Sequence, residues 1–115
     1  MPDWRDEEAR NETVFRDMNE WTAEANDARL GVDRPIDSYL CECSNRRCTD
    51  PIDLTRSEYE AVRAVSVQFA IALDHENPEI DRVVFEGQRF ATVEKFYGNG
   101  ARIARESDPR RSATP

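Results

Sequence analysis

The stretch Cys41-Glu42-Cys43-Ser44-Asn45-Arg46-Arg47-Cys48 holds all three cysteines of the chain. Its Cys-x-Cys-x4-Cys spacing places three sulfurs on one tight turn, where they can point at a common centre. Thiolate sulfur and imidazole nitrogen are preferred ligands of tetrahedral zinc. The only histidine, His75, follows an apolar run, and 26 residues (49–74) separate it from the last cysteine. Cys41, Cys43, Cys48 and His75 therefore predict one closed Cys3His site that binds a structural zinc ion.

Two alternatives to zinc stay open, because 26 intervening residues (49–74) exceed the spacing of common zinc fingers. The three cysteines could instead be free thiols, and the histidine an ordinary surface residue. An iron–sulfur cluster can also take cysteine and histidine ligands. A single metal ion is favoured, because it would use every cysteine and the only histidine of the chain as ligands.

The remaining chemistry of the chain predicts no enzyme. A catalytic zinc keeps an open position for water, whereas His75 fills the fourth position here. The sequence lacks a glycine-rich phosphate loop and the cysteine and histidine pattern of zinc deaminases. Glu76 or Asp74 would become a candidate general base only if His75 were not a ligand.

Composition limits the classes of partner. The chain has 115 residues, of which 38% are apolar and 35% charged, so one small core benefits from a metal cross-link. The net charge of −8 argues against a nucleic-acid partner, which would require a cationic surface. Only residues 97–115, with four arginines and two acids, are basic enough to meet an anion. We expect a protein partner instead.

No apolar run is long enough to span a membrane, and the acidic N-terminus does not resemble a signal peptide. These features predict a cytoplasmic protein without a membrane segment. A reducing compartment would keep the cysteines as thiols.

Residues 1–30 form the first unit of the expected organisation, an amphipathic helix that is regular over 5–29. Apolar side chains recur there at four-three-four-three spacing, which predicts a stripe that packs into the core rather than a dimer seam; they are Val14, Met18, Trp21, Ala25 and Ala28. The Asn-Glu pairs at 11–12 and 19–20 are expected on the solvated face, and Trp4 off the stripe. Gly31 is the expected C-cap.

Residues 31–97 are expected to complete the same domain as a zinc-stabilised core. After a polar connector over 31–38, the pattern predicts extended segments over 39–43 and 52–54, then a helix that begins at Arg56 behind a Thr55–Glu58 capping box. Alternation predicts a strand over 67–73, and residues 80–86 and 89–96 form a hairpin around Gly87-Gln88. Residues 98–115 read as a disordered tail. The predicted class is α+β, with a long N-terminal helix, a zinc knuckle, a short second helix and a small antiparallel sheet that ends in the hairpin.

Several of these motifs together resemble a group of small, uncharacterised actinobacterial proteins. The resemblance covers roughly residues 10–96; its motifs are Asn11-Glu12, Phe15-Arg16, Asn19-Glu20, the cysteine stretch, Leu54-Thr55, Glu58-Tyr59-Glu60-x-Val62-Arg63, His75-Glu76, Arg82-Val83-Val84 and Val93-Glu94-Lys95. Members of the group carry glycine before the histidine, where this chain has Asp74. The resemblance implies a domain and a ligand set, and no activity.

These observations favour a non-enzymatic, zinc-stabilised interaction or regulatory module. The alternative is a zinc-thiolate redox switch, because zinc-bound thiolates remain nucleophilic. A nucleic-acid binder that uses Arg46, Arg47 and the basic tail is the third possibility.

Overall fold

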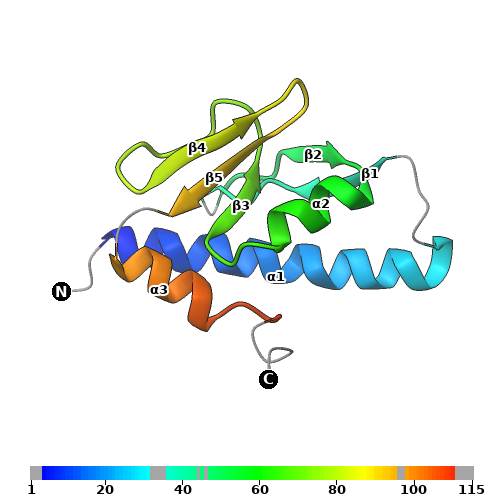
Figure 1. Ribbon diagram of the computed structural model, residues 1–115, viewed down its shortest axis with the longest axis horizontal. Coiled ribbons are helices and arrows are strands. Elements are labelled where there is room, and N and C mark those ends of the chain that lie inside the picture. The colour runs from blue at the N-terminus through cyan, green and yellow to red at the C-terminus, as the bar shows by residue number, and fades with distance from the viewer. Residues whose placement is uncertain (1–3, 32–35, 44, 46, 96–97, 111–115) are drawn as a thin grey trace.

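The computed structural model describes residues 4–31, 36–43, 45, 47–95 and 98–110. It confirms the α+β class. In chain order the elements are α1 (Trp4–Leu30), β1 (Asp37–Leu40), β2 (Pro51–Leu54), α2 (Arg56–Arg63), β3 (Gln68–Ile71), β4 (Asp81–Glu86), β5 (Ala91–Lys95) and α3 (Gly98–Glu106). Figure 1 shows α1 running along the length of the molecule, with α2 and both sheets on one side of it.

The strands form two small antiparallel sheets. β1 pairs with β2, and β5 lies between β3 and β4 in a sheet of order β3-β5-β4. The cysteine-bearing segment after β1 runs beside the free edge of β3, because the Glu42 amide donates a hydrogen bond to the Ala70 carbonyl at 2.8 Å. This contact brings the two sheets together next to the cysteines.

Two predicted helix boundaries are confirmed. Thr55 caps α2 by accepting a hydrogen bond from the Glu58 amide, and the Glu58 carboxylate accepts one from the Thr55 amide. Gly31 follows α1 with a φ of +82°, a conformation that glycine adopts without steric cost, and its amide donates to the Asp27 carbonyl.

The strands differ from the predicted ones in detail. β1 ends at Leu40, before the cysteines, and β3 is shorter than the alternating run over 67–73. Phe69, Ala70 and Ile71 are all fully buried, so both faces of β3 are covered. The hairpin between β4 and β5 turns through four residues, 87–90, rather than through Gly87-Gln88 alone, and the Gly87 amide donates to the Phe90 carbonyl. Of the polar connector expected over 31–38, residues 32–35 lie outside the described part, whereas Asp37 and Ser38 belong to β1.

The predicted core face of α1 is wrong. Val14, Met18 and Trp21 are 55%, 49% and 73% exposed, and Ala25 and Ala28 are exposed as well. The helix instead buries the opposite face, whose side chains are mostly polar: Ala9, Glu12, Thr13, Arg16, Asn19, Glu20 and Ala23. The Asn-Glu pairs that were expected in solvent thus contribute Glu12, Asn19 and Glu20 to the interior.

Asn19 shows why a polar face can be buried. Its side-chain amide donates to the Leu40 carbonyl at 2.9 Å, and its oxygen accepts from the Leu40 amide at 2.8 Å. The same amide donates to the Glu42 carboxylate at 2.8 Å. A buried polar group that keeps its hydrogen bonds avoids most of the cost of leaving water. Asn19 therefore fastens α1 to β1 and to the cysteine segment.

Charged residues on the same face are paired in the same way. Arg16 donates to the carbonyls of Ser66 and Ala104 and lies over the Phe69 ring. Lys95, which is fully buried, forms ion pairs with Glu12 and Asp81. Burial raises the pKa of Glu12, although the charge of Lys95 opposes that shift.

The C-terminal part corrects a further prediction. Residues 98–106, expected to be disordered, form α3, which packs on the N-terminal half of α1. After α3, Asp108 pairs with the buried Arg63, and Arg110 forms ion pairs with Glu20 and Glu60. Residues 111–115 lie outside the described part of the chain. The arginine at 110 thus pairs within the protein itself.

None of the described helices is both long enough and apolar enough to cross a bilayer.

The inverted orientation of α1 can be tested by paired substitutions. We expect Asn19→Ala to lower the free energy of unfolding by about 3 kcal/mol, since it removes one of two hydrogen bonds to the buried Glu42 carboxylate and both side-chain hydrogen bonds to the Leu40 backbone. Met18→Ala, on the predicted stripe, should change it by less than about 0.5 kcal/mol. Urea unfolding of dilute protein measures both; a larger loss for Met18→Ala would contradict the observed packing.

Candidate metal centre

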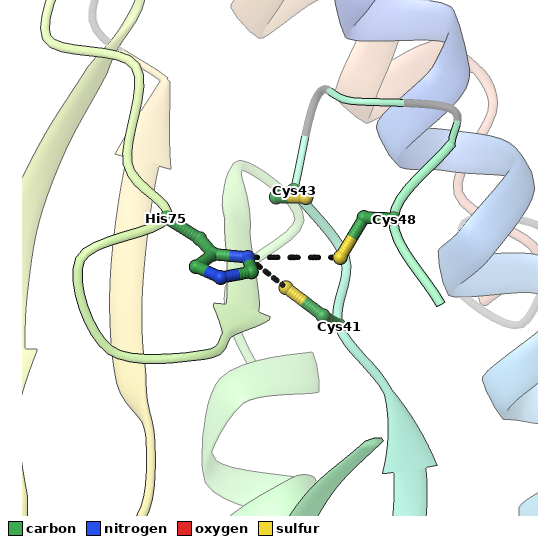
Figure 2. A group of neighbouring side chains, drawn as sticks. All are labelled: Cys41, Cys43, Cys48 and His75. Atoms are coloured by element: carbon green, nitrogen blue, oxygen red, sulfur yellow. Dashed lines mark hydrogen bonds between the residues drawn. The ribbon is translucent and has the colours of Figure 1, made fainter. Parts of the chain in front are cut away.

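The structure brings the four predicted ligands together. Figure 2 shows the three cysteines on one side and His75 approaching from the opposite side, on the loop that follows β3. The ligand atoms of Cys41, Cys43, Cys48 and His75 all lie within 4.8 Å of one another. The group therefore has a composition and spacing that could hold one metal ion.

The distances to the imidazole fit a tetrahedral site. His75 Nδ1 lies 3.5 Å from the Cys41 sulfur and 3.6 Å from the Cys48 sulfur. A zinc ion with metal–nitrogen and metal–sulfur bonds of about 2.0 and 2.3 Å separates these atoms by about 3.6 Å at the tetrahedral angle. The ring thus presents Nδ1, rather than Nε2, to the sulfurs.

The backbone around the cysteines is fixed by local hydrogen bonds. The Cys41 amide donates to the Asp50 carbonyl at 3.1 Å, which closes the base of the loop, and the Cys48 amide donates to the Asn45 carbonyl at 2.9 Å, which forms the turn. The Ala72 amide donates to the Cys41 sulfur at 3.1 Å. Amide donors to a ligand sulfur stabilise its negative charge, so β3 supports the site as well as the loop does.

The thiols share charge among themselves. The hydrogen bond with Cys41 lowers the pKa of Cys43 to about 5, and the same bond raises the pKa of Cys41. Burial raises the pKa of Cys48. The lowered pKa of Cys43 favours its thiolate, which is the form of cysteine that binds metals.

Glu42, between two of the ligands, anchors the site to the core. Its carboxylate is completely buried and accepts hydrogen bonds from Asn19 and from the Ala70 amide. Burial raises its pKa to about 7, although both hydrogen bonds oppose the shift. Through Glu42 the cysteine segment contacts α1 and β3 at once. This role could not be predicted from the sequence, since a glutamate in a polar turn is normally exposed.

Asp50 is a second residue that the sequence analysis missed. Its carboxylate oxygen lies 3.3 Å from His75 Nε2, on the side of the ring opposite the sulfurs. Carboxylates commonly accept a hydrogen bond from the second nitrogen of a metal-binding histidine, which fixes the tautomer and the ring orientation. Only its position two residues after Cys48 could have suggested it.

Asp74 directs His75 toward the sulfurs. It has a φ of +67°, the only positive φ outside glycine among the described residues. The left-handed conformation is unfavourable for residues with a Cβ, although aspartate tolerates it better than most. The chain reverses here, immediately after β3, and the His75 amide donates to the Ala72 carbonyl.

The remaining residues singled out around the site do not join it. Within the described residues, the metal-binding group contains neither Asp74 nor Glu76. Arg47 is exposed, and its amide donates to the Asn45 side chain. Arg46 lies outside the described part of the chain.

Comparison of the chain with protein-family models, with curated proteins and with solved structures finds no match.

The backbone at Asp74 leads to a further prediction. Asp74→Val should lower the free energy of unfolding of the metal-loaded protein by about 1–2 kcal/mol, because a β-branched side chain is strained at positive φ. Asp74→Gly removes the Cβ and should leave stability unchanged or higher. Thermal unfolding of both variants measures this, and equal losses would show that the side chain of Asp74 matters more than its backbone.

Proposed function

We propose that Cys41, Cys43, Cys48 and His75 bind one structural Zn²⁺, and that the protein is a non-enzymatic, zinc-stabilised interaction or regulatory module. The observation that carries this proposal is the approach of His75 Nδ1 to within 3.5 and 3.6 Å of two cysteine sulfurs. Four soft or borderline ligands that converge within 4.8 Å suit zinc, and a shell of four protein ligands would leave no open position for substrate or water.

The compactness of the ligand set favours a single ion over a cluster. All four ligand atoms lie within 4.8 Å of one another, which suits ligands that share one metal. An iron–sulfur cluster distributes its ligands over different irons and needs space for bridging sulfides between them.

The positive φ of Asp74 also supports membership in the actinobacterial group named above, whose members usually carry glycine at this position.

A metal ion at this site would cross-link the two halves of the core. The cysteines follow β1, whereas His75 follows β3 in the other sheet. Chain segments 26 residues apart (49–74) would then be held together through one ion. In small domains of this kind the free energy of metal binding becomes free energy of folding.

The regulatory alternative is a zinc-thiolate redox switch. Cys48 is only partly buried, whereas Cys41 and Cys43 are buried, so an oxidant would reach Cys48 first. If the protein is such a switch, low doses of peroxide should release zinc rapidly, as followed with a zinc-sensitive dye. Slow release from the native protein would favour the structural role alone.

The metal itself gives the direct test of the leading proposal. We expect protein purified without added metal to contain one zinc per chain by elemental analysis. A strong chelator should lower the melting temperature, and free zinc at about 1,000 times its Kd should restore about 4 kcal/mol of stability. Cys48→Ser and His75→Ala should each lose most of the bound metal.

A matched substitution separates ligands from their support. Asp50→Asn should keep one zinc per chain but weaken its affinity by about 10–100-fold, since it alters only the hydrogen bond to His75. Glu79→Gln serves as the control, because it also converts an acid to an amide, at an exposed residue four positions after His75. Iron in place of zinc would reject the metal assignment, and a melting curve insensitive to chelator would reject the structural role.

A further inference from the structure

The apolar face of α1 has no partner among the described residues. We call Val14, Met18, Trp21, Ala25 and Ala28 the α1 seam; all five are exposed. Trp21, at 73%, is the most exposed large apolar side chain. The seam lies on the side of the helix opposite the buried polar face, so no rearrangement of the core could cover it. Contiguous exposed apolar surface of this kind is typical of an interaction site.

A groove lies beside the seam. It runs between α1 and α3, has a volume of about 480 Å³ and is lined by Arg10, Thr13, Val14, Arg102, Ile103 and Glu106. Its lining includes the aliphatic side chains of Val14 and Ile103 and two arginines, Arg10 and Arg102. A groove of this composition suits an aromatic side chain, which packs against the aliphatic walls and receives the arginines at its ring face.

We propose that the α1 seam is the interface of a homodimer, in which α1 of a second copy packs antiparallel to it. Val14, in the groove, and Trp21, the exposed knob, are seven residues or about 10 Å apart along the same helix. A two-fold axis between them places Trp21 of each copy over the groove of the other. Both contacts form together, as a self-complementary two-fold interface requires.

With the two-fold axis between Val14 and Trp21, antiparallel pairing overlaps the two helices along nearly all of their 27 residues. Parallel pairing would instead stack Trp21 on Trp21 of the second copy and leave the groove unfilled.

Charges at the edge of the seam select the same arrangement. Arg10 and Glu24 are exposed on the same side of the seam, 14 residues apart. Antiparallel pairing brings Arg10 of each copy beside Glu24 of the other, which gives two symmetric ion pairs. Asp17 lies on this side of the seam near the two-fold axis, so it comes close to Asp17 of the second copy. The repulsion between the two carboxylates lowers the affinity of the dimer.

Sedimentation equilibrium of the full, zinc-loaded chain from about 1 to 500 μM tests the proposal. We expect a monomer–dimer equilibrium. Trp21→Asp should weaken it more than about 100-fold, since it removes the central knob of the interface. Arg10→Glu and Glu24→Arg should each weaken it about tenfold. The double variant, which restores the opposite charges, should recover most of the native affinity, and Asp17→Asn should tighten the dimer.

Each outcome is informative. A monomer at every concentration would overturn the proposal and leave the seam to a different protein. A dimer that Trp21→Asp leaves intact would place the interface elsewhere, and failure of the charge-swapped double variant to recover would reject the antiparallel register. Zinc content and melting temperature of the same dilute samples should match the native protein, because the changed residues are exposed and distant from the metal centre. This control separates failure of the dimer from failure of the metal assignment.

Discussion

The convergence of His75 with three cysteines is the constraint on which the rest of the structure depends. Nδ1 of the ring faces the sulfurs at 3.5 and 3.6 Å, and Nε2 faces Asp50. The cysteines follow β1 and His75 follows β3 in the other sheet, so this contact joins the two halves of the core. A chain with 35% charged residues has little apolar surface to fix that arrangement by burial alone.

Hydrogen-bonded polar groups complete what the apolar core cannot. Asn19 binds both backbone groups of Leu40, and it also binds the Glu42 carboxylate between two metal ligands. The candidate metal centre and α1 are therefore parts of one hydrogen-bonded network. Because α1 buries its polar face in this network, its apolar face is exposed.

Parts of the structure could be predicted from the sequence, and the reasons are local. The ligand set followed from the small number of cysteines and histidines, and the start of α2 from the Thr55–Glu58 capping box. The buried face of α1 could not be predicted, since hydrophobic periodicity assumes that polar side chains seek water. The partners of Arg16 lie 50 and 88 residues away, where no local pattern indicates them. α3 was missed because Gly98 and Gly100 suggested coil, while Ala104 accepts a hydrogen bond from Arg16.

The central claim is that one zinc ion is bound by three sulfurs and one imidazole. X-ray absorption at the zinc edge, on protein purified without added metal, tests it most directly. The account predicts three sulfur neighbours at about 2.3 Å and one nitrogen at about 2.0–2.1 Å. A zinc shell made of light atoms alone, or an absorption edge belonging to iron, would contradict it.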